Sequence, residues 1–146
     1  MYKPASFLRI LLPFLPAIAI AYFIFKYGVN VPFWDQWGPI AETLILDSQG
    51  QLTFQALLSQ ANESKPFFPK LVFLGLAKLT QWNTRAEMAI TWLLALLVFA
   101  NLYFLVNRTL KELSGWGKAI VLLLISFVVF SPVQVENWLW GIQMIV

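Results

Sequence analysis

Three long runs of apolar residues divide the chain, and charged residues gather near their ends. The runs cover residues 7–27, 88–106 and 119–135, and the second contains no charged side chain. A helix needs about 20 predominantly apolar residues to cross the hydrocarbon core of a bilayer. The pattern therefore predicts three transmembrane helices, followed over residues 136–146 by an outer turn and the start of a further span.

The first run has a cleaved signal peptide as its alternative interpretation. The apolar part of a signal peptide is about 7–15 residues long and is followed by small residues at the cleavage site. This run is longer, and aromatic side chains crowd its end at Tyr22, Phe23, Phe25 and Tyr27. We therefore predict a retained signal anchor, in which Pro13 and Pro16 fall in the first turns, where a kink is tolerated.

Residues 28–87 form a long loop with regularly spaced charges and three shorter amphipathic patterns. The first predicts a helix near 36–47, because apolar residues recur there at helical spacing. The second predicts a helix near 53–61 with Thr53 as its N-cap. The third, near 66–79, has about 13 apolar-rich residues with two lysines, which is too short for a span and typical of an interfacial helix.

Basic residues set the expected orientation. Lys3 and Arg9 precede the first run, and residues 107–118 form a short basic loop between the second and third runs. Because cytoplasmic loops carry the excess of Lys and Arg, this loop and the N-terminus are expected inside and residues 28–87 outside. The fold class is then an all-α integral membrane protein, with residues 1–146 forming a single membrane domain.

Composition supports a membrane environment and excludes several chemistries. The chain is 60% hydrophobic and 12% charged, whereas soluble domains carry about 25% charged residues. The net charge of +3 is not gathered into a basic stripe, so nucleic acid is not an expected partner. The chain contains no Cys and no His, which excludes thiolate chemistry, Cys/His zinc sites and an imidazole base.

The leading candidate for chemistry is Asp35, which lies between Trp34 and Trp37 just beyond the first run. A carboxylate shielded by indole rings could act as a general base, bind a metal ion or pair with a cationic group. The alternative is that Asp35 caps a helix beginning at Gln36, while the tryptophans form an interfacial aromatic belt. An Asp can cap and react at once, so both interpretations stay open.

Two further clusters are candidates for the same site. Glu63, Lys65 and Lys70 put an acid and two amines beside the third amphipathic pattern, where the amines could hold a lipid phosphate through charge-assisted hydrogen bonds. Their alternative is a solvated turn with snorkelling lysines. Glu136 and Trp138, at the outer end of the third run, could complete the pocket or could form an ordinary helix end with an aromatic anchor.

Three segments in order, residues 33–37 (FWDQW), 62–71 (NESKPFFPKL) and 131–141 (SPVQVENWLWG), carry a family resemblance. Together they resemble the N-terminal part of a family of uncharacterised bacterial polytopic membrane proteins related to the GT-C glycosyltransferases. Members of that superfamily transfer a sugar from a polyprenyl-phosphate donor to an acceptor outside the cytoplasm. The resemblance implies a multi-pass protein of the bacterial inner membrane, with the helices at 36–47 and 66–79 beside the bilayer.

The resemblance also implies roles for individual residues. Asp35 and Glu63 would be catalytic, and a divalent cation, if one is needed, would bind Asp35. Contacts to the substrate would come from Trp34, Trp37, Lys65, Lys70, Glu136 and Trp138. The family pattern has His and Arg at the positions of Ser64 and Lys65, and Lys offers a point charge where Arg would grip a phosphate bidentately.

GT-C enzymes have more spans than the three predicted here. We therefore expect the chain to be the front part of such an enzyme, inactive by itself. The alternative function is that of a small non-enzymatic membrane scaffold or assembly protein. Its outer loop would bind a partner through Trp34 and Trp37 rather than through the carboxylate of Asp35.

Overall fold

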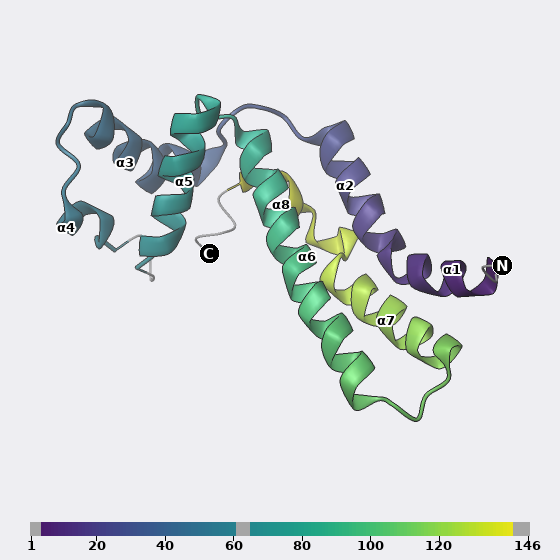
Figure 1. The fold of residues 1–146 in the computed structure, drawn as a ribbon. Helices are drawn as coiled ribbons and strands as arrows, with labels where there is room; N and C mark the ends of the chain where they lie inside the picture. The colour runs from purple at the N-terminus through teal and green to yellow at the C-terminus, as the bar shows by residue number, and fades with distance from the viewer. Residues whose placement is uncertain (1–3, 61–64, 142–146) are drawn as a thin grey trace. The chain divides into compact units, whose positions relative to one another are not determined.

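The computed structural model describes residues 4–60 and 65–141, and every element within these ranges is a helix (Figure 1). The chain divides into two compact units. Met1–Tyr27 and Trp92–Val135 form the first, which we call the bundle unit. Gly28–Thr91 and Glu136–Val146 form the second, which we call the loop unit.

Three helical stretches are long and apolar enough to cross a membrane: Phe7–Tyr27, Thr84–Thr109 and Gly115–Leu139. They coincide with the three predicted spans, so the prediction of an all-helical fold with three helices able to cross a membrane is confirmed for the described residues. The further span falls mostly on residues 142–146, which lie outside the described residues.

The first stretch is built from three consecutive elements, α1 (Pro4–Leu11), the 3₁₀ turn η1 (Leu12–Phe14) and α2 (Leu15–Tyr27). Pro13 lies at the start of the 3₁₀ turn. Because proline has no N–H and its ring clashes with the preceding turn, a helix containing it must adjust locally. The tighter 3₁₀ turn is the form that this adjustment takes.

The second and third stretches are α6 (Thr84–Thr109) and α7 (Gly115–Val129). Ser114 caps α7, since its hydroxyl oxygen accepts a hydrogen bond from the N–H of Gly117 at 3.1 Å. After α7 the chain breaks near Pro132 into the short turn η3 (Pro132–Gln134), and α8 (Val135–Leu139) follows. The third helix thus begins before the predicted 119–135 segment and is interrupted within it.

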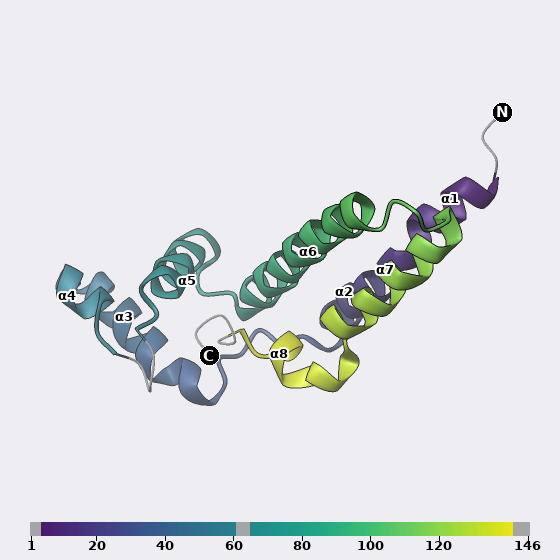
Figure 2. The same cartoon turned by 90° about the horizontal axis from the view of Figure 1, so that it is seen from below.

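Aromatic rings and small residues pack the bundle unit. The ring of Phe99 is fully buried and makes edge contacts with Phe14 at a centroid distance of 5.4 Å and with Phe130 at 6.0 Å. The first stretch packs along α7 (Figures 1 and 2), where Ala17 and Ala119 are both buried. Small side chains let helix backbones approach closely, which is how helices associate in lipid.

The loop unit contains the 3₁₀ turn η2 (Trp34–Trp37) and helices α3 (Pro39–Ser48), α4 (Phe54–Leu57) and α5 (Phe67–Thr80). The predicted N-cap of the second helix is confirmed, because the hydroxyl of Thr53 accepts from the N–H of Ala56 at 3.1 Å. The helix predicted over 36–47 is instead two elements. Gly38 separates them, and Pro39 starts α3, a position that needs no N–H.

Buried apolar side chains hold these short helices together. Ile40 of α3 and Phe73 of α5 are at most 2% exposed and form the centre of the cluster. Leu44, Trp82 and Trp140 pack around them. At the surface, the ammonium of Lys78 lies 2.9 Å from the carboxylate of Asp47 and joins α5 to α3 a second time.

Candidate functional site around Asp35

Side-chain hydrogen bonds fix the loop that carries Asp35, which we call the Asp35 loop (residues 32–37). The amide oxygen of Gln36 accepts from the N–H of Phe33 at 2.9 Å. The indole N–H of Trp37 donates to the carbonyl of Pro32, and that of Trp140 donates to the carbonyl of Phe33, each at 3.1 Å. In this loop, side chains therefore supply the hydrogen bonds that backbone N–H and carbonyl groups would form with one another in a helix.

Asp35 lies inside η2, where its backbone carbonyl accepts from the N–H of Gly38 at 3.0 Å. The N-cap of η2 is Phe33 and that of α3 is Gly38. The interpretation of Asp35 as the cap of a helix starting at Gln36 is therefore wrong. The Asp35 side chain is half-buried, and its carboxylate has no hydrogen bond or ion pair with any described residue.

The residues that flank Asp35 in the chain carry exposed aromatic rings. Phe33, Trp34 and Trp37 are 63%, 71% and 61% exposed. Trp34 stacks on Trp140 at a centroid distance of 5.9 Å and an interplanar angle of 10°. Its backbone has a φ of 47°, in the left-handed region that bulky residues rarely adopt. Such strain is often found at functional sites, where the surrounding structure maintains it.

A buried polar pair that sequence reasoning missed joins the Asp35 loop to α6. Gln36 and Glu87 are each 1% exposed, and the Gln36 amide donates to the Glu87 carboxylate at 2.6 Å. The indole N–H of Trp82 lies near the Glu87 carboxylate and acts on it, but the two do not form a hydrogen bond of good geometry. A Cβ on Gly141 would collide with the Glu87 carboxylate, so only glycine fits there.

Hydrogen bonds at the start of α6 place Glu87 beside the Asp35 loop. The fully buried Thr84 donates its N–H to the side chain of Asn30 at 2.8 Å and its hydroxyl to the carbonyl of Val29 at 2.9 Å. Arg85 donates to the carbonyl of Gly28 at 2.8 Å. The first turn of α6 is thus attached to the segment that leads into the Asp35 loop, and Glu87 follows within that turn.

Lys70, predicted as a phosphate contact, is 3% exposed and bound within the chain. Its ammonium donates to the carbonyls of Ala56 and Ser59 at 3.1 and 3.0 Å and to the Ser59 hydroxyl at 2.7 Å. These bonds use the three N–H groups of the ammonium. Burial lowers the pKa of Lys70, an effect that the negative charge of Glu42 partly opposes.

The remaining predicted site residues differ in their surroundings. Lys65 and Glu136 have exposed side chains, whereas Trp138 is 2% exposed and packed inside. Glu63 lies outside the described residues. Trp140, which follows the third stretch, contacts the Asp35 loop through a hydrogen bond to Phe33 and through ring contacts with Phe33 and Trp34.

A divalent cation does not fit the part of the site that the structure describes. No three acidic, His or Cys side chains gather there into a metal-binding group. Asp35 offers one carboxylate, and the carboxylate of Glu87 is already hydrogen-bonded to the Gln36 amide. Oxygen-rich ions such as Mg²⁺ and Ca²⁺ take several ligands.

Comparisons with known proteins return no match: no family model, no curated protein and no solved structure is similar to this chain.

Proposed function

We propose that this chain is a membrane glycosyltransferase component of the GT-C-like class, which uses a polyprenyl-phosphate-linked sugar as donor. The observation that carries the proposal is the half-buried carboxylate of Asp35, which has no partner among the described residues although its loop is held in place. A base positioned in advance is what general base catalysis needs. The exposed faces of Trp34 and Trp37 offer flat apolar surfaces beside it.

In the proposed reaction, Asp35 accepts the proton of an acceptor hydroxyl as its oxygen attacks the anomeric carbon of the sugar. The bond between that carbon and the phosphate oxygen breaks, and its electron pair leaves with the lipid phosphate. The configuration at the anomeric carbon inverts. Lys65, which is exposed, is the lysine of the predicted pair that remains available to the phosphate.

The proposal includes an orientation in the bacterial inner membrane, with the N-terminus and residues 110–114 in the cytoplasm and the loop unit outside. It can be tested because the natural chain contains no cysteine. We expect Gln49→Cys to react with a membrane-impermeant maleimide on intact cells, whereas Glu112→Cys reacts only after the cells are opened. Both positions are exposed, so the reverse labelling would overturn the orientation.

The catalytic role is tested in membrane vesicles from the native cells, so that any further components that transfer needs are present. In these vesicles Asp35→Asn is compared with the natural protein on a labelled polyprenyl-phosphate sugar. We expect sugar transfer to fall by about 10²- to 10⁴-fold, which is the usual contribution of a general base. Glu42→Gln makes the same change of charge at an exposed position of α3 and should leave transfer unchanged. Equal transfer by Asp35→Asn and the natural protein would refute the role of Asp35.

A scaffold function is the alternative, and the exposed aromatic rings of the Asp35 loop favour it. Tryptophan is enriched among the residues that contribute most to protein–protein binding, and Trp34 is 71% exposed. If the loop docks a partner, Trp34→Ala abolishes co-purification of that partner while Asp35→Asn retains it. Loss of sugar transfer in Asp35→Asn, with any partner still bound, supports the enzyme instead.

A further inference from the structure

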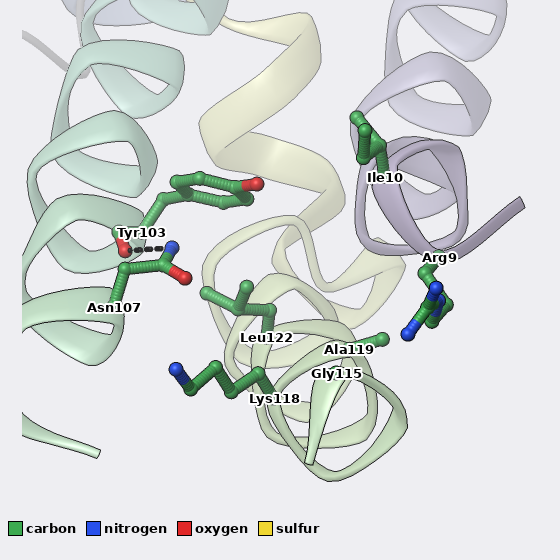
Figure 3. A pocket seen from close by; sticks show the side chains of 8 residues that line it. All are labelled: Arg9, Ile10, Tyr103, Asn107, Gly115, Lys118, Ala119 and Leu122. Atoms are coloured by element: carbon green, nitrogen blue, oxygen red, sulfur yellow. Dashed lines mark hydrogen bonds between the residues drawn. The ribbon is translucent and has the colours of Figure 1, made fainter. Parts of the chain in front are cut away.

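A cavity of about 250 Å³ opens in the bundle unit, and none of its lining residues belongs to the Asp35 loop. Three helical stretches line it: the start of the first, the end of α6 and the start of α7. Figure 3 shows Tyr103 and Asn107 of α6 on one side, Arg9 and Ile10 on the other, and Lys118 of α7 along the base. The cavity thus lies at one end of all three candidate spans.

The charge of this cavity is positive. Arg9 and Lys118 line it, and no acidic residue does; Glu112, in the nearby 110–114 segment, is exposed and outside it. The Lys118 ammonium has no hydrogen-bond or ion-pair partner among the described residues. The Lys118 ammonium, in a cavity without a lining carboxylate, is a cation that an anion would neutralise through charge-assisted hydrogen bonds.

The local structure holds Arg9 at the cavity wall. Its guanidinium lies 5.9 Å from the centre of the Trp116 ring, within the range of a cation–π contact. It also lies against Gly115, where an added Cβ would collide with one guanidinium nitrogen. Glycine at this first position of α7 therefore gives the guanidinium its place.

We propose that this cavity binds the phosphate-bearing head group of an anionic phospholipid. Its volume of about 250 Å³ lies below the roughly 300–1,000 Å³ of pockets that hold drug-sized ligands, so a head group fits it better than a whole ligand of that size. Basic pockets between transmembrane helices on the cytoplasmic side bind anionic head groups. Ile10, which lines the cavity and is 54% exposed, gives the acyl chains an apolar surface at its edge.

A lipid fits this place better than a soluble phosphate, because the cavity sits at the ends of apolar helices rather than on a polar surface. The proposal does not use the Asp35 loop, since no residue of that loop lines the cavity, but it rests on the proposed orientation, which places this end of the bundle unit in the cytoplasm. The two proposals also differ in charge, because the cavity carries basic side chains, whereas the Asp35 loop carries a carboxylate.

The test uses the purified full chain in an uncharged detergent. Its thermal unfolding is followed while phosphatidylglycerol, phosphatidylcholine or inorganic phosphate is added. A ligand that binds only the folded state raises the melting temperature in a saturable way. We expect phosphatidylglycerol to stabilise the protein, and phosphatidylcholine to do so much less. Equal stabilisation by the two lipids, or equal affinity for inorganic phosphate, would overturn the assignment to an anionic lipid.

Matched variants locate the binding. Lys118→Gln and Arg9→Gln should each weaken phosphatidylglycerol binding about fivefold, the equivalent of about 1 kcal/mol for one basic residue. Gly115→Ala should weaken it without any change of charge, by displacing the Arg9 guanidinium. Lys111→Gln, at an exposed position outside the cavity, is the control and should change the affinity by less than about twofold. An equal loss in Lys111→Gln and Lys118→Gln would refute the cavity as the site.

Discussion

The two units of this chain are held together by different interactions. In the bundle unit, the fully buried Phe99 packs against the rings of Phe14 and Phe130. The indole N–H of Trp92 in α6 donates a hydrogen bond of 2.9 Å to the Ala17 carbonyl of α2. Among the described residues of the bundle unit, the buried polar side chain is Ser126. In the described part of the loop unit, five polar or charged side chains are buried beside the apolar cluster of Ile40 and Phe73: Gln36, Thr43, Lys70, Thr84 and Glu87. Each of these five is hydrogen-bonded to groups elsewhere in the unit or in its own helix.

The difference follows from the lengths of the elements. A span of about 20 residues satisfies its own backbone groups and needs only side-chain packing against its neighbours. The loop unit has short helices joined by irregular segments, whose carbonyls and N–H groups need partners from side chains. Removing a hydrogen-bonding side chain should therefore cost much in the loop unit and little in the bundle unit.

The largest effect is expected for Gln36→Ala. This change leaves the buried carboxylate of Glu87 without its amide donor and the N–H of Phe33 without its acceptor. A buried group left unsatisfied costs about 1–3 kcal/mol, and more when it is charged. We expect the free energy of unfolding in mixed detergent micelles to fall by about 3 kcal/mol.

Gln49→Ala is the control, because Gln49 is exposed just after α3 and should change stability by less than about 0.5 kcal/mol. The conservative variant Glu87→Gln keeps a carbonyl oxygen for the Gln36 amide and should be milder than Gln36→Ala. If Gln36→Ala were no more destabilising than Gln49→Ala, the buried pair would not be what holds the Asp35 loop.

A smaller loss, about 2 kcal/mol, is expected for Lys70→Met, which removes the donor to two carbonyls and one hydroxyl. Lys78→Met is the matched control. Its ammonium pairs with Asp47, but the side chain is 59% exposed, and exposed ion pairs contribute about 0–1 kcal/mol. Equal losses in the two variants would contradict the distinction between a buried and a surface lysine.

The pH dependence sharpens the same test. Burial lowers the pKa of Lys70 below its ordinary value of 10.5, so the unfolded chain holds this proton up to a higher pH than the folded chain does. Stability contributed by this group therefore rises with pH between the lowered pKa and 10.5. Unfolding measured across this alkaline range should show that rise in the natural protein and lose it in Lys70→Met.

Sequence patterns were informative wherever a local rule decides the structure. The length of the apolar runs gave the three spans, and the hydroxyl of Thr53 gave a helix cap. Asp35, Trp34 and Trp37 fall in one loop because they are neighbours in the chain. The partners of that loop could not be found in this way. Glu87 lies 51 residues from Gln36, and Trp140 lies 107 residues from Phe33.

Such pairings depend on how complete helices pack, and no periodicity specifies which polar side chains then meet. Two weak signals do exist in the sequence. Glu87 is an acid directly before a 19-residue run without charge, and Gln36 is an uncharged polar residue among aromatic ones. A polar side chain at the edge of an apolar segment is costly to bury unless it is paired, so each indicates that a partner exists without indicating which one.

The smallest effect is expected for Trp92→Phe in the bundle unit. The ring is largely kept, and the hydrogen bond from the indole N–H to the Ala17 carbonyl is lost. That carbonyl lies within α2 and can still accept the N–H four residues later, whereas the Glu87 carboxylate is buried and takes its 2.6 Å hydrogen bond from the Gln36 side chain. Side-chain hydrogen bonds between membrane helices contribute about 0.6 kcal/mol on average, and we expect a loss of that size in the same unfolding measurement. A loss as large as that of Gln36→Ala would mean that the bundle unit also depends on its polar contacts, and the contrast between the two units would fail.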